Sequence, residues 1–258
     1  MRKIGLKLWS CNTDNYLNIA QSLYKDGFFD YIELYIVPGN QNRLKNWLNL
    51  NIPFDIHAPH FAHNMNLSKK EYLESNLEYY KEVKLYADAL ESDVIVFHGG
   101  TDGYLDETIR QLNLINDVRT LIENKPYKVM PFINGKHYVG CTPDEIKNIL
   151  SGVNCGFCFD VCHALCVERS LGLPTYTLCE SFVDLKPKRI HLSDHNILEE
   201  LDYHLNYGKG SIDFERILKI IPADVAITVE TPKSSKTDLE DFKQDVCYLK
   251  EKIKRIDL

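Results

Sequence analysis

The stretch Gly156-Phe-Cys-Phe-Asp160-Val-Cys-His163 joins a short apolar run to an acidic side chain and then to a histidine. A short apolar run with aromatic residues is typical of a buried strand in a parallel sheet. In α/β barrels the functional face lies at the carboxyl ends of the strands. The stretch therefore predicts a strand that ends at a functional site, and similar units recur along the chain.

Apolar runs of this kind alternate with longer helical patterns. A helix is expected over 14–25, another from Ser68 with Glu71 at the capping-box position, a third from Thr142-Pro143, and a last one from Thr237 or Asp238. The eight candidate strands are Ile4–Leu8, Tyr31–Tyr35, Phe54–Ile56, Asp93–Phe97, Lys128–Phe132, Gly156–Asp160, Arg189–Leu192 and Ala226–Val229. This alternation predicts one α/β domain over residues 1–258, a single (β/α)₈ TIM barrel.

Composition and charge exclude several other classes of protein. The chain has 258 residues, of which 44% are hydrophobic and 26% charged, as in a globular domain with a large core. The amino-terminal residues resemble no signal peptide, and no apolar stretch reaches the roughly 18 residues of a membrane span, so we expect a cytoplasmic protein. The net charge of −7 provides no overall attraction to nucleic acid, although a local basic rim remains compatible with it.

Eight cysteines occur in the chain. Without a sign of secretion, reduced thiols are expected rather than disulfides. Cys155 and Cys158 form a CxxC pair, and Cys162 and Cys166 follow closely. These four run through a predicted strand into its loop, which is unlike the ligand spacing of a structural zinc or iron–sulfur site.

Histidines and carboxylates gather where the predicted strands end. A single histidine at such a place is usually a core or loop residue, but six segments that deliver such side chains to one rim indicate a metal site. Imidazole together with carboxylate suits Zn²⁺ or Mn²⁺. His60, His63 and His195 are expected to support the site or brace loops. The other residues at these ends are His57, His98, Asp160, His163, His191, Asp202, His204 and Glu230.

Three motifs in these segments resemble the endonuclease IV family, part of the xylose-isomerase-like group of barrels. Cys158-Phe-Asp160-Val-Cys-His163-Ala164 is similar to the motif at the family's sixth strand, and His191-Leu-Ser-Asp194 to that at the seventh. Asp202-Tyr-His204 with Gly208-Lys-Gly210 resembles the family's Asp-x-His followed by Gly-x-Gly. The resemblance extends from about Pro53 to Thr231 and implies hydrolysis of the phosphodiester on the 5′ side of an abasic site in DNA.

The resemblance also implies up to three metal ions, zinc or alternatively manganese. His57 and His98 would hold the first ion. Clustered cations neutralise a phosphate and activate water near neutral pH. Asp160 and Glu230 would be the catalytic residues as well as ligands. The remaining sets would be Asp160, His191 and Glu230 for the second ion, and His163, Asp202 and His204 for the third.

The sequence departs from the family at two places. The family has a glutamate at the end of its fifth strand that bridges two metals, and the predicted fifth strand here has no acidic residue, with Asn134 as a neutral substitute. Lys7 stands where a histidine is expected. Glu33-Leu-Tyr35 looks more like the sugar isomerase and epimerase branch.

Three functions remain open at this point. The first is a metal-dependent phosphodiesterase acting on abasic-site DNA or another phosphate ester. The second is an isomerase or epimerase of a sugar or a small phosphorylated sugar, with one metal at Asp160, His191 and Glu230. The third is a metal-binding barrel without catalysis.

DNA binding would require contacts on the rim of the barrel. The segment Asn40-Gln41-Asn42-Arg43 resembles a loop that relatives press against the duplex. The basic residues of the rim, each equally interpretable as solvated surface, are Lys69, Lys70, Lys209, Lys233 and Lys236.

Overall fold

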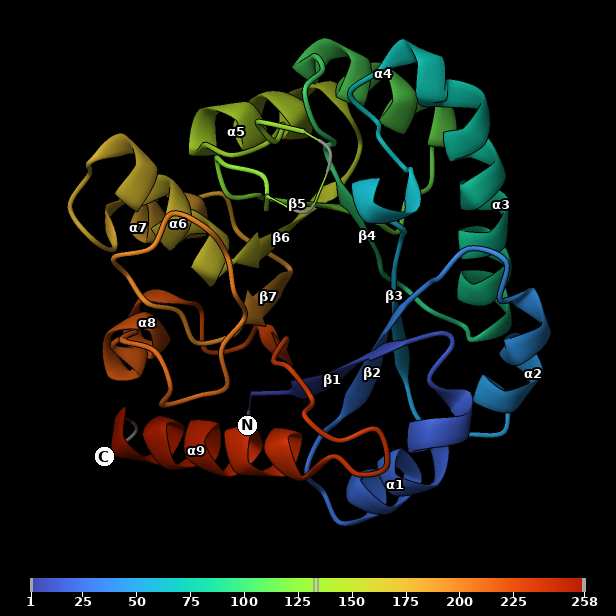
Figure 1. Ribbon diagram of the computed structural model, residues 1–258, viewed down its shortest axis with the longest axis vertical. Coiled ribbons are helices and arrows are strands. Elements are labelled where there is room, and N and C mark those ends of the chain that lie inside the picture. Colours follow the sequence, from blue (N-terminus) through green and yellow to red (C-terminus); the bar gives the residue numbers. More distant parts are fainter. Residues whose placement is uncertain (1, 132, 134, 257–258) are drawn as a thin grey trace.

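Eight parallel strands close into a barrel in the computed structural model, which describes residues 2–131, 133 and 135–256 (Figure 1). Each strand pairs with the next along the chain, and the first also pairs with the last, with Ile4 opposite Ile227. The predicted (β/α)₈ fold of the α/β class is confirmed. The strands are β1 (Ile4–Trp9), β2 (Tyr31–Tyr35), β3 (Phe54–His57), β4 (Ile95–His98), β5 (Thr120–Glu123), β6 (Gly156–Asp160), β7 (Arg189–Leu192) and β8 (Ala226–Val229).

Helices surround the barrel and cover the outward faces of its strands (Figure 1). The start of α5 confirms the predicted N-cap Thr142 followed by Pro143. It also forms a capping box, because the Thr142 hydroxyl accepts the backbone N–H of Glu145 and the Glu145 carboxylate accepts that of Thr142. The helices are α1 (Thr13–Lys25), α2 (Leu44–Trp47), α3 (Leu73–Ala89), α4 (Leu105–Ile115), α5 (Pro143–Gly152), α6 (Val161–Leu171), α7 (Thr177–Val183), α8 (Phe214–Ile220) and α9 (Glu240–Ile256), with 3₁₀ turns η1 (Gln41–Arg43), η2 (Phe61–His63) and η3 (Lys70–Tyr72).

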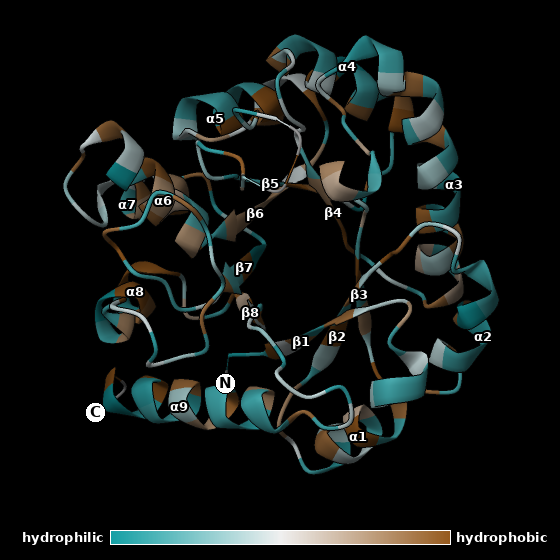
Figure 2. Ribbon diagram, viewed as in Figure 1, coloured by the Kyte–Doolittle hydropathy of each residue, from teal (hydrophilic) through white to brown (hydrophobic). Residues whose placement is uncertain are grey.

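The core lies mainly between the barrel and its helices. Successive side chains of a strand point to opposite faces, so alternate residues of each strand face outward. Those that face the helices, such as Ile95 and Phe97 of β4, belong to the large apolar core, and Figure 2 shows hydrophobic colour on the helices' inner sides. Val94 and Val96 alternate with them and form a separate small cluster with Leu121 and Cys158. The barrel interior therefore has little apolar filling, and polar side chains occupy the rest.

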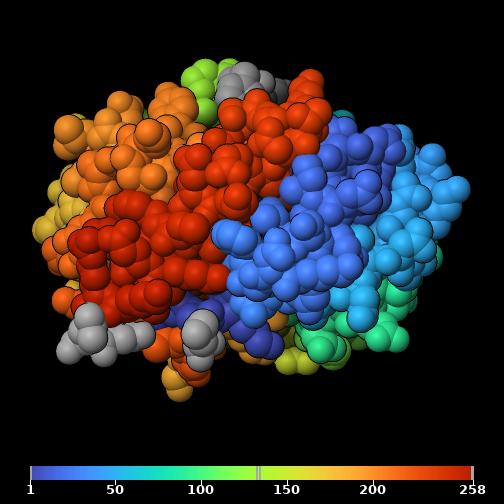
Figure 3. Space-filling view, turned by 90° about the horizontal axis from the view of Figure 1, so that it is seen from below, coloured from blue at the N-terminus to red at the C-terminus, as the bar shows by residue number. Residues whose placement is uncertain are grey.

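The first and last helices meet on one side of the barrel, where α9 lies next to α1 (Figure 3). The ring of Phe29, just after α1, contacts that of Phe242 of α9 at 5.8 Å between centroids. The Lys243 ammonium lies 5.7 Å from the centre of the neighbouring Phe28 ring. This packing covers the junction at which β8 joins β1.

The predicted fifth strand is wrong. Thr120–Glu123 takes this place, with Thr120 opposite Ile95 of β4 and Glu123 opposite both His98 of β4 and Cys158 of β6. The predicted segment Lys128–Phe132 lies beyond this strand, where Lys128 makes one antiparallel bridge to His137; Phe132 is outside the described residues. Pro131 has no N–H to donate, so this segment is a poor central strand although it is apolar.

Smaller corrections concern the starts of elements. β4 begins at Ile95. The helix expected from Ser68 begins at Leu73, after η3. Ser68 does not cap it, because its hydroxyl donates to Asn66 Oδ1 at 2.7 Å. The last helix begins at Glu240, whose backbone N–H donates to the Asp238 carboxylate at 3.1 Å. Across the described part of the chain, the helices are too short or too polar to cross a membrane.

Candidate metal centre

The carboxyl ends of the strands surround a cavity of about 740 Å³ at the mouth of the barrel. Lys7 and His57 reach it from β1 and β3, and His98 from β4. The first turn of α6 contributes His163, and the loops after β7 and β8 contribute Asp202, His204 and Glu230. Residues that are far apart in the sequence meet here because every parallel strand ends at the same face of the barrel.

Glu123 lies at the centre of the cluster. Its Oε2 is 3.2 Å from His57 Nε2, 3.1 Å from His98 Nε2 and 3.3 Å from His191 Nδ1. The carboxylate is buried at the end of β5. The glutamate that we expected to be absent is therefore present, and Asn134, the predicted substitute, lies outside the described residues.

Two histidines hold one ring nitrogen on a backbone carbonyl. His57 Nδ1 is 2.8 Å from the oxygen of Ala58, and His163 Nδ1 is 2.8 Å from that of Asn124. A carbonyl only accepts, so these nitrogens donate and Nε2 of each ring faces the carboxylates. His57 Nε2 thereby faces Glu123.

The same arrangement occurs at His191 and His204. His191 Nε2 donates to Glu33 Oε2 at 2.8 Å, which leaves Nδ1 facing Glu230 Oε2 at 2.9 Å. His204 Nδ1 donates to the backbone oxygen of Glu230 at 2.9 Å. Hydrogen bonds of this kind orient imidazoles that bind metals.

His163, Asp202 and His204 form an outer group. Asp202 Oδ2 is 3.1 Å from His163 Nε2 and 2.6 Å from His204 Nε2. Burial opposes a charge on His204, but Asp202 raises its pKa to about 10. For His163, burial and Lys125 oppose Asp160 and Asp202, and the pKa is raised to about 9. The structure brings the three residues together as the Asp-x-His spacing predicts.

Asp160 performs a structural task at the same place. Its Oδ1 accepts the backbone N–H of His163 at 2.8 Å and caps α6. Burial raises the pKa of Asp160, although His163 acts in the opposite direction. With Glu123 and His163, Asp160 offers donor atoms within 4.8 Å of one another, so the capping carboxylate also belongs to the cluster.

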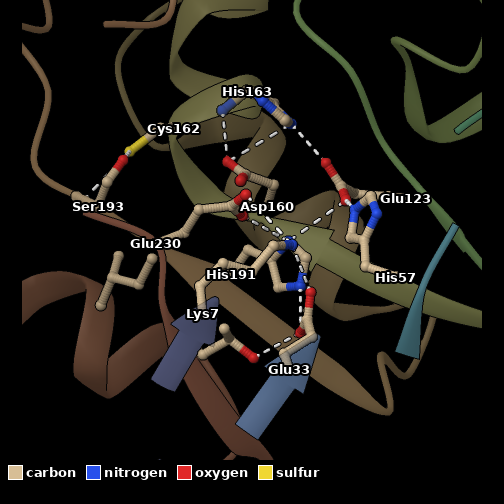
Figure 4. Close-up of polar contacts among 12 residues, drawn as sticks. Lys7, Glu33, His57, Glu123, Asp160, Cys162, His163, His191, Ser193 and Glu230 are labelled. Atoms are coloured by element: carbon tan, nitrogen blue, oxygen red, sulfur yellow. Dashed lines mark hydrogen bonds and ion pairs between the residues drawn. The ribbon is translucent and has the colours of Figure 1, made fainter. Parts of the chain in front are cut away.

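The buried donor atoms fit divalent metal ions. An imidazole lone pair close to a carboxylate oxygen is unfavourable unless a proton or a cation lies between them. His57 and His191 each direct a nitrogen at one oxygen of Glu123 (Figure 4). His98 Nε2 faces the same oxygen. Within residues 2–131, 133 and 135–256, His98 Nδ1 and His191 Nδ1 are buried without a hydrogen-bond partner. Nitrogen and oxygen donors in this number are the set that zinc and manganese prefer.

Basic side chains influence two of the carboxylates. Burial alone would raise the pKa of Glu123, but His98, Lys125 and His191 hold it well below its usual value. Burial acts in the same way on Glu230, and Lys7 with His191 lowers its pKa. Both side chains are therefore carboxylates at neutral pH and are available to a cation.

Lys7 and Glu33 add a buried ion pair beneath the histidines (Figure 4). Lys7 Nζ is 2.6 Å from Glu33 Oε1 and 3.3 Å from Glu230 Oε1, and Glu33 Oε2 also accepts the Thr228 hydroxyl at 2.7 Å. Burial lowers the pKa of Lys7, but Glu230 and Glu33 outweigh it and raise that pKa. In the sequence, Lys7 and Glu33 were noted only as departures from the endonuclease IV pattern, and neither was predicted to take part in the site.

Glu123 is missing from the predicted site, together with Lys125 two residues later. The signal that was available is the run Thr120-Leu-Ile-Glu123, a short strand-like segment that ends on a carboxylate like its neighbours. Cys158 offers its sulfur beside Glu123 and His191, but burial raises its pKa to about 12, which disfavours the thiolate that a metal requires.

The three histidines that were predicted to support the site lie near the centre. His60 stacks on His98 with ring centroids 5.2 Å apart, and His63 Nδ1 is 2.7 Å from the Tyr35 hydroxyl. His195 is buried away from the cavity, and its Nε2 lies 3.2 Å from the backbone oxygen of Glu199. These positions agree with supporting roles.

The loop that resembles a DNA contact is built into the protein surface. The backbone N–H of Asn40 donates to Glu82 Oε1 at 2.9 Å, and Arg43 Nη1 donates to both oxygens of Asp14 at 2.8 Å. Gln41 begins the turn η1 between them. An Arg43 that is paired with Asp14 offers less free charge to a phosphate.

Comparison with known proteins gives relatives of two kinds. A Thermoplasma volcanium protein named Probable endonuclease 4 is 25% identical over 218 residues, which are 77% of this chain and 72% of that protein. A D-tagatose 3-epimerase-like protein of known structure is 20% identical, with a TM-score of 0.75 over 99% of this chain and 98% of that one. Endonuclease IV from Thermus thermophilus is 17% identical, with a TM-score of 0.69 over 98% of this chain and 99% of that one.

The structural similarities concern the fold, which enzymes of different chemistry share. The family model described as a xylose isomerase-like TIM barrel matches residues 24–252, most of the chain. That match includes seven of the eight strands and the metal-ligand candidates from His57 to Glu230. The chain therefore belongs to the xylose isomerase-like TIM barrel family.

Proposed function

We propose that the protein is a divalent-metal-dependent phosphodiesterase resembling endonuclease IV, which hydrolyses the DNA backbone at abasic sites or a related phosphate ester. The observation that carries the proposal is the outer group of His163, Asp202 and His204 beside the inner cluster around Glu123. A sugar isomerase with one metal needs only the inner cluster. Relatives named Probable endonuclease 4 support the same choice.

Zinc, or alternatively manganese, is the cofactor that we propose. His57, His98 and Glu123 would hold a first ion. Glu123 would also be a ligand of a second ion, together with three further residues that are named below. When bound, these ions would neutralise the phosphate charge and activate water. The three companions of Glu123 at the second ion would be Asp160, His191 and Glu230, and the third ion would take His163, Asp202 and His204.

The protein's own residues would orient and anchor this centre. Glu33 and the carbonyls of Ala58 and Asn124 fix the rings of the histidines that they contact. Glu230 lines the cavity and is anchored by Lys7, so its carboxylate would face a substrate. Asp160 is buried behind the cavity wall, so it would act through its position as a ligand.

The epimerase alternative retains one specific observation. Such chemistry uses two acid–base groups, which in relatives are glutamates. Glu123 and Glu230 both approach His191, so the pair that seemed incomplete in the sequence is present. The third candidate, a metal-binding barrel without catalysis, rested on the apparent lack of a glutamate at the fifth strand. Because Glu123 occupies that place, this reason no longer applies.

The deciding experiment uses His163→Ala and His204→Ala. Each variant is assayed on a duplex with one abasic site and on a panel of ketose phosphates, with zinc or manganese added. Strand cleavage by the wild type, reduced roughly 100-fold or more in both variants, is the expected result, since each removes a direct ligand. His137→Ala, an exposed histidine, is the matched control. Sugar isomerisation that persists in both variants, with no cleavage by the wild type, would overturn the proposal in favour of the epimerase.

A further inference from the structure

Lys125 brings a positive charge into the candidate metal centre. It follows the end of β5 by two residues, and its backbone N–H donates to the oxygen of Gly140 at 2.9 Å. Its side chain is only 7% exposed. Burying an ammonium requires partners that offset the lost hydration.

Those partners belong to two different groups of metal-ligand candidates. Lys125 Nζ is 3.1 Å from Glu123 Oε1 in the inner cluster and 3.2 Å from His163 Nε2 in the outer group. The Tyr138 ring, whose centre is 5.7 Å away, packs beside the ammonium. Lys125 therefore links the two groups directly.

The contact with His163 occupies the atom that an outer metal ion would need. His163 Nδ1 is already held by the oxygen of Asn124, so Nε2 is the nitrogen that faces Asp202 and His204. An ammonium at 3.2 Å from that nitrogen and a dication bound to it would repel each other strongly at such short range. The hydrogen bond from Lys125 goes to Glu123 Oε1, whereas His57, His98 and His191 of the inner cluster face Oε2.

We propose that the Lys125 ammonium competes with a metal ion for the outer group, so that the protein binds inner ions tightly and the outer ion much more weakly. The inference rests on the proposed metal centre and adds a device that sets its occupancy. Lys125 also lines the 740 Å³ cavity, so its side chain has space to leave His163 when the outer ion binds.

The test is a zinc titration of the full chain by equilibrium dialysis at buffered free zinc, with zinc per chain as the readout. The wild type should fill its inner positions first and take the outer ion only at higher free zinc. In Lys125→Met the outer ion should bind roughly tenfold or more tightly, because the competing charge is gone. Lys125→Arg keeps the charge and should resemble the wild type.

Two further variants define the site of the effect. Lys128→Met removes an ammonium three residues away, which is paired with Glu200 instead, and should change nothing. In His163→Ala the Lys125→Met change should have no effect on zinc binding, because the outer group is incomplete. If Lys125→Met does not fold, Lys125→Gln provides the comparison. In the wild type, acetylation of Lys125 should also increase when the outer ion binds.

The outcomes separate this inference from the proposed function. A wild type that binds no zinc or manganese would refute the metal centre itself. A wild type that takes all its ions at one free-zinc concentration, with unchanged affinity in Lys125→Met, would refute the competition while leaving the phosphodiesterase proposal intact.

Discussion

Glu33 accepts a 2.8 Å hydrogen bond from His191 through Oε2 while its other oxygen binds the ammonium of Lys7. Both members of the Glu33–His191 pair are buried, on β2 and β7 respectively. The contact decides which nitrogen of His191 faces Glu123 and Glu230. Glu33, which is not among the predicted ligands, thus orients one of them.

Glu33→Ala should lower zinc affinity by roughly 10–100-fold, as loss of an orienting carboxylate does. It should also destabilise the metal-free protein by about 3–5 kcal/mol, because Lys7 loses a buried partner. Calorimetric zinc titration and chemical denaturation measure the two effects. The double variant Lys7→Met with Glu33→Leu should recover stability and not affinity. Wild-type affinity in Glu33→Ala would show that Glu33 does not position His191.

Asp160→Asn should lose bound metal while keeping the fold. Asparagine can still accept the N–H of His163 and cap α6, but it removes the charge that a cation requires. Elemental analysis after purification without a chelator gives occupancy, and a thermal melt checks the fold. Asp213→Asn changes the equivalent cap of α8, away from the cavity, and should retain the metal. Unchanged occupancy in Asp160→Asn would make Asp160 only a cap.

Glu123→Gln tests the residue at the centre of the cluster. The amide keeps the size of the side chain but cannot share its charge between two ions, so we expect loss of both inner ions. Metal analysis and the melting temperature with added zinc are the measurements. Glu168→Gln is the control, because Glu168 is equally buried but binds the backbone of α7 through Leu178. Full inner occupancy in Glu123→Gln would contradict the assignment.

Stabilisation by zinc should increase between pH 7 and pH 9. The pKa of His204 in the metal-free fold is about 10, above roughly 6.5 for an unfolded histidine. The stability that this proton contributes is therefore complete below about pH 6.5 and is lost as the pH rises through about 10. Metal must displace the same proton, so its affinity for the outer group rises over that range.

Thermal melts at pH 7 and 9, with and without buffered zinc, measure this change. His204→Ala should show a smaller dependence on pH, since the titrating group is removed. A zinc-induced increase in melting temperature that shrinks toward pH 9 would contradict the assignment of His204 as a ligand.

The sequence alone determined the repeating architecture and most of the candidate site. Seven of the eight strands lie where apolar runs alternate with helical patterns, because a fully buried parallel strand must be apolar along its length. Eight site residues follow directly from this. Most were recognised because they lie in or directly after a run such as Gly156–Asp160, and strand ends share one face of a barrel. Asp202 and His204 were recognised in the loop that follows the seventh strand, by their Asp-x-His spacing.

Only the tertiary structure decided which segment became β5. Thr120–Glu123 and Lys128–Phe132 are both short, mostly apolar runs. Pro131 counts against the second, but a proline alone does not exclude an edge strand or a strand end. The choice depends on pairing, since Thr120 aligns with Ile95 and Leu121 with Gly156 in neighbouring strands. That register places Glu123 at the centre of the cluster. The contacts of Lys125 and Glu33 were likewise beyond sequence reasoning, because they join groups that meet only when the barrel closes.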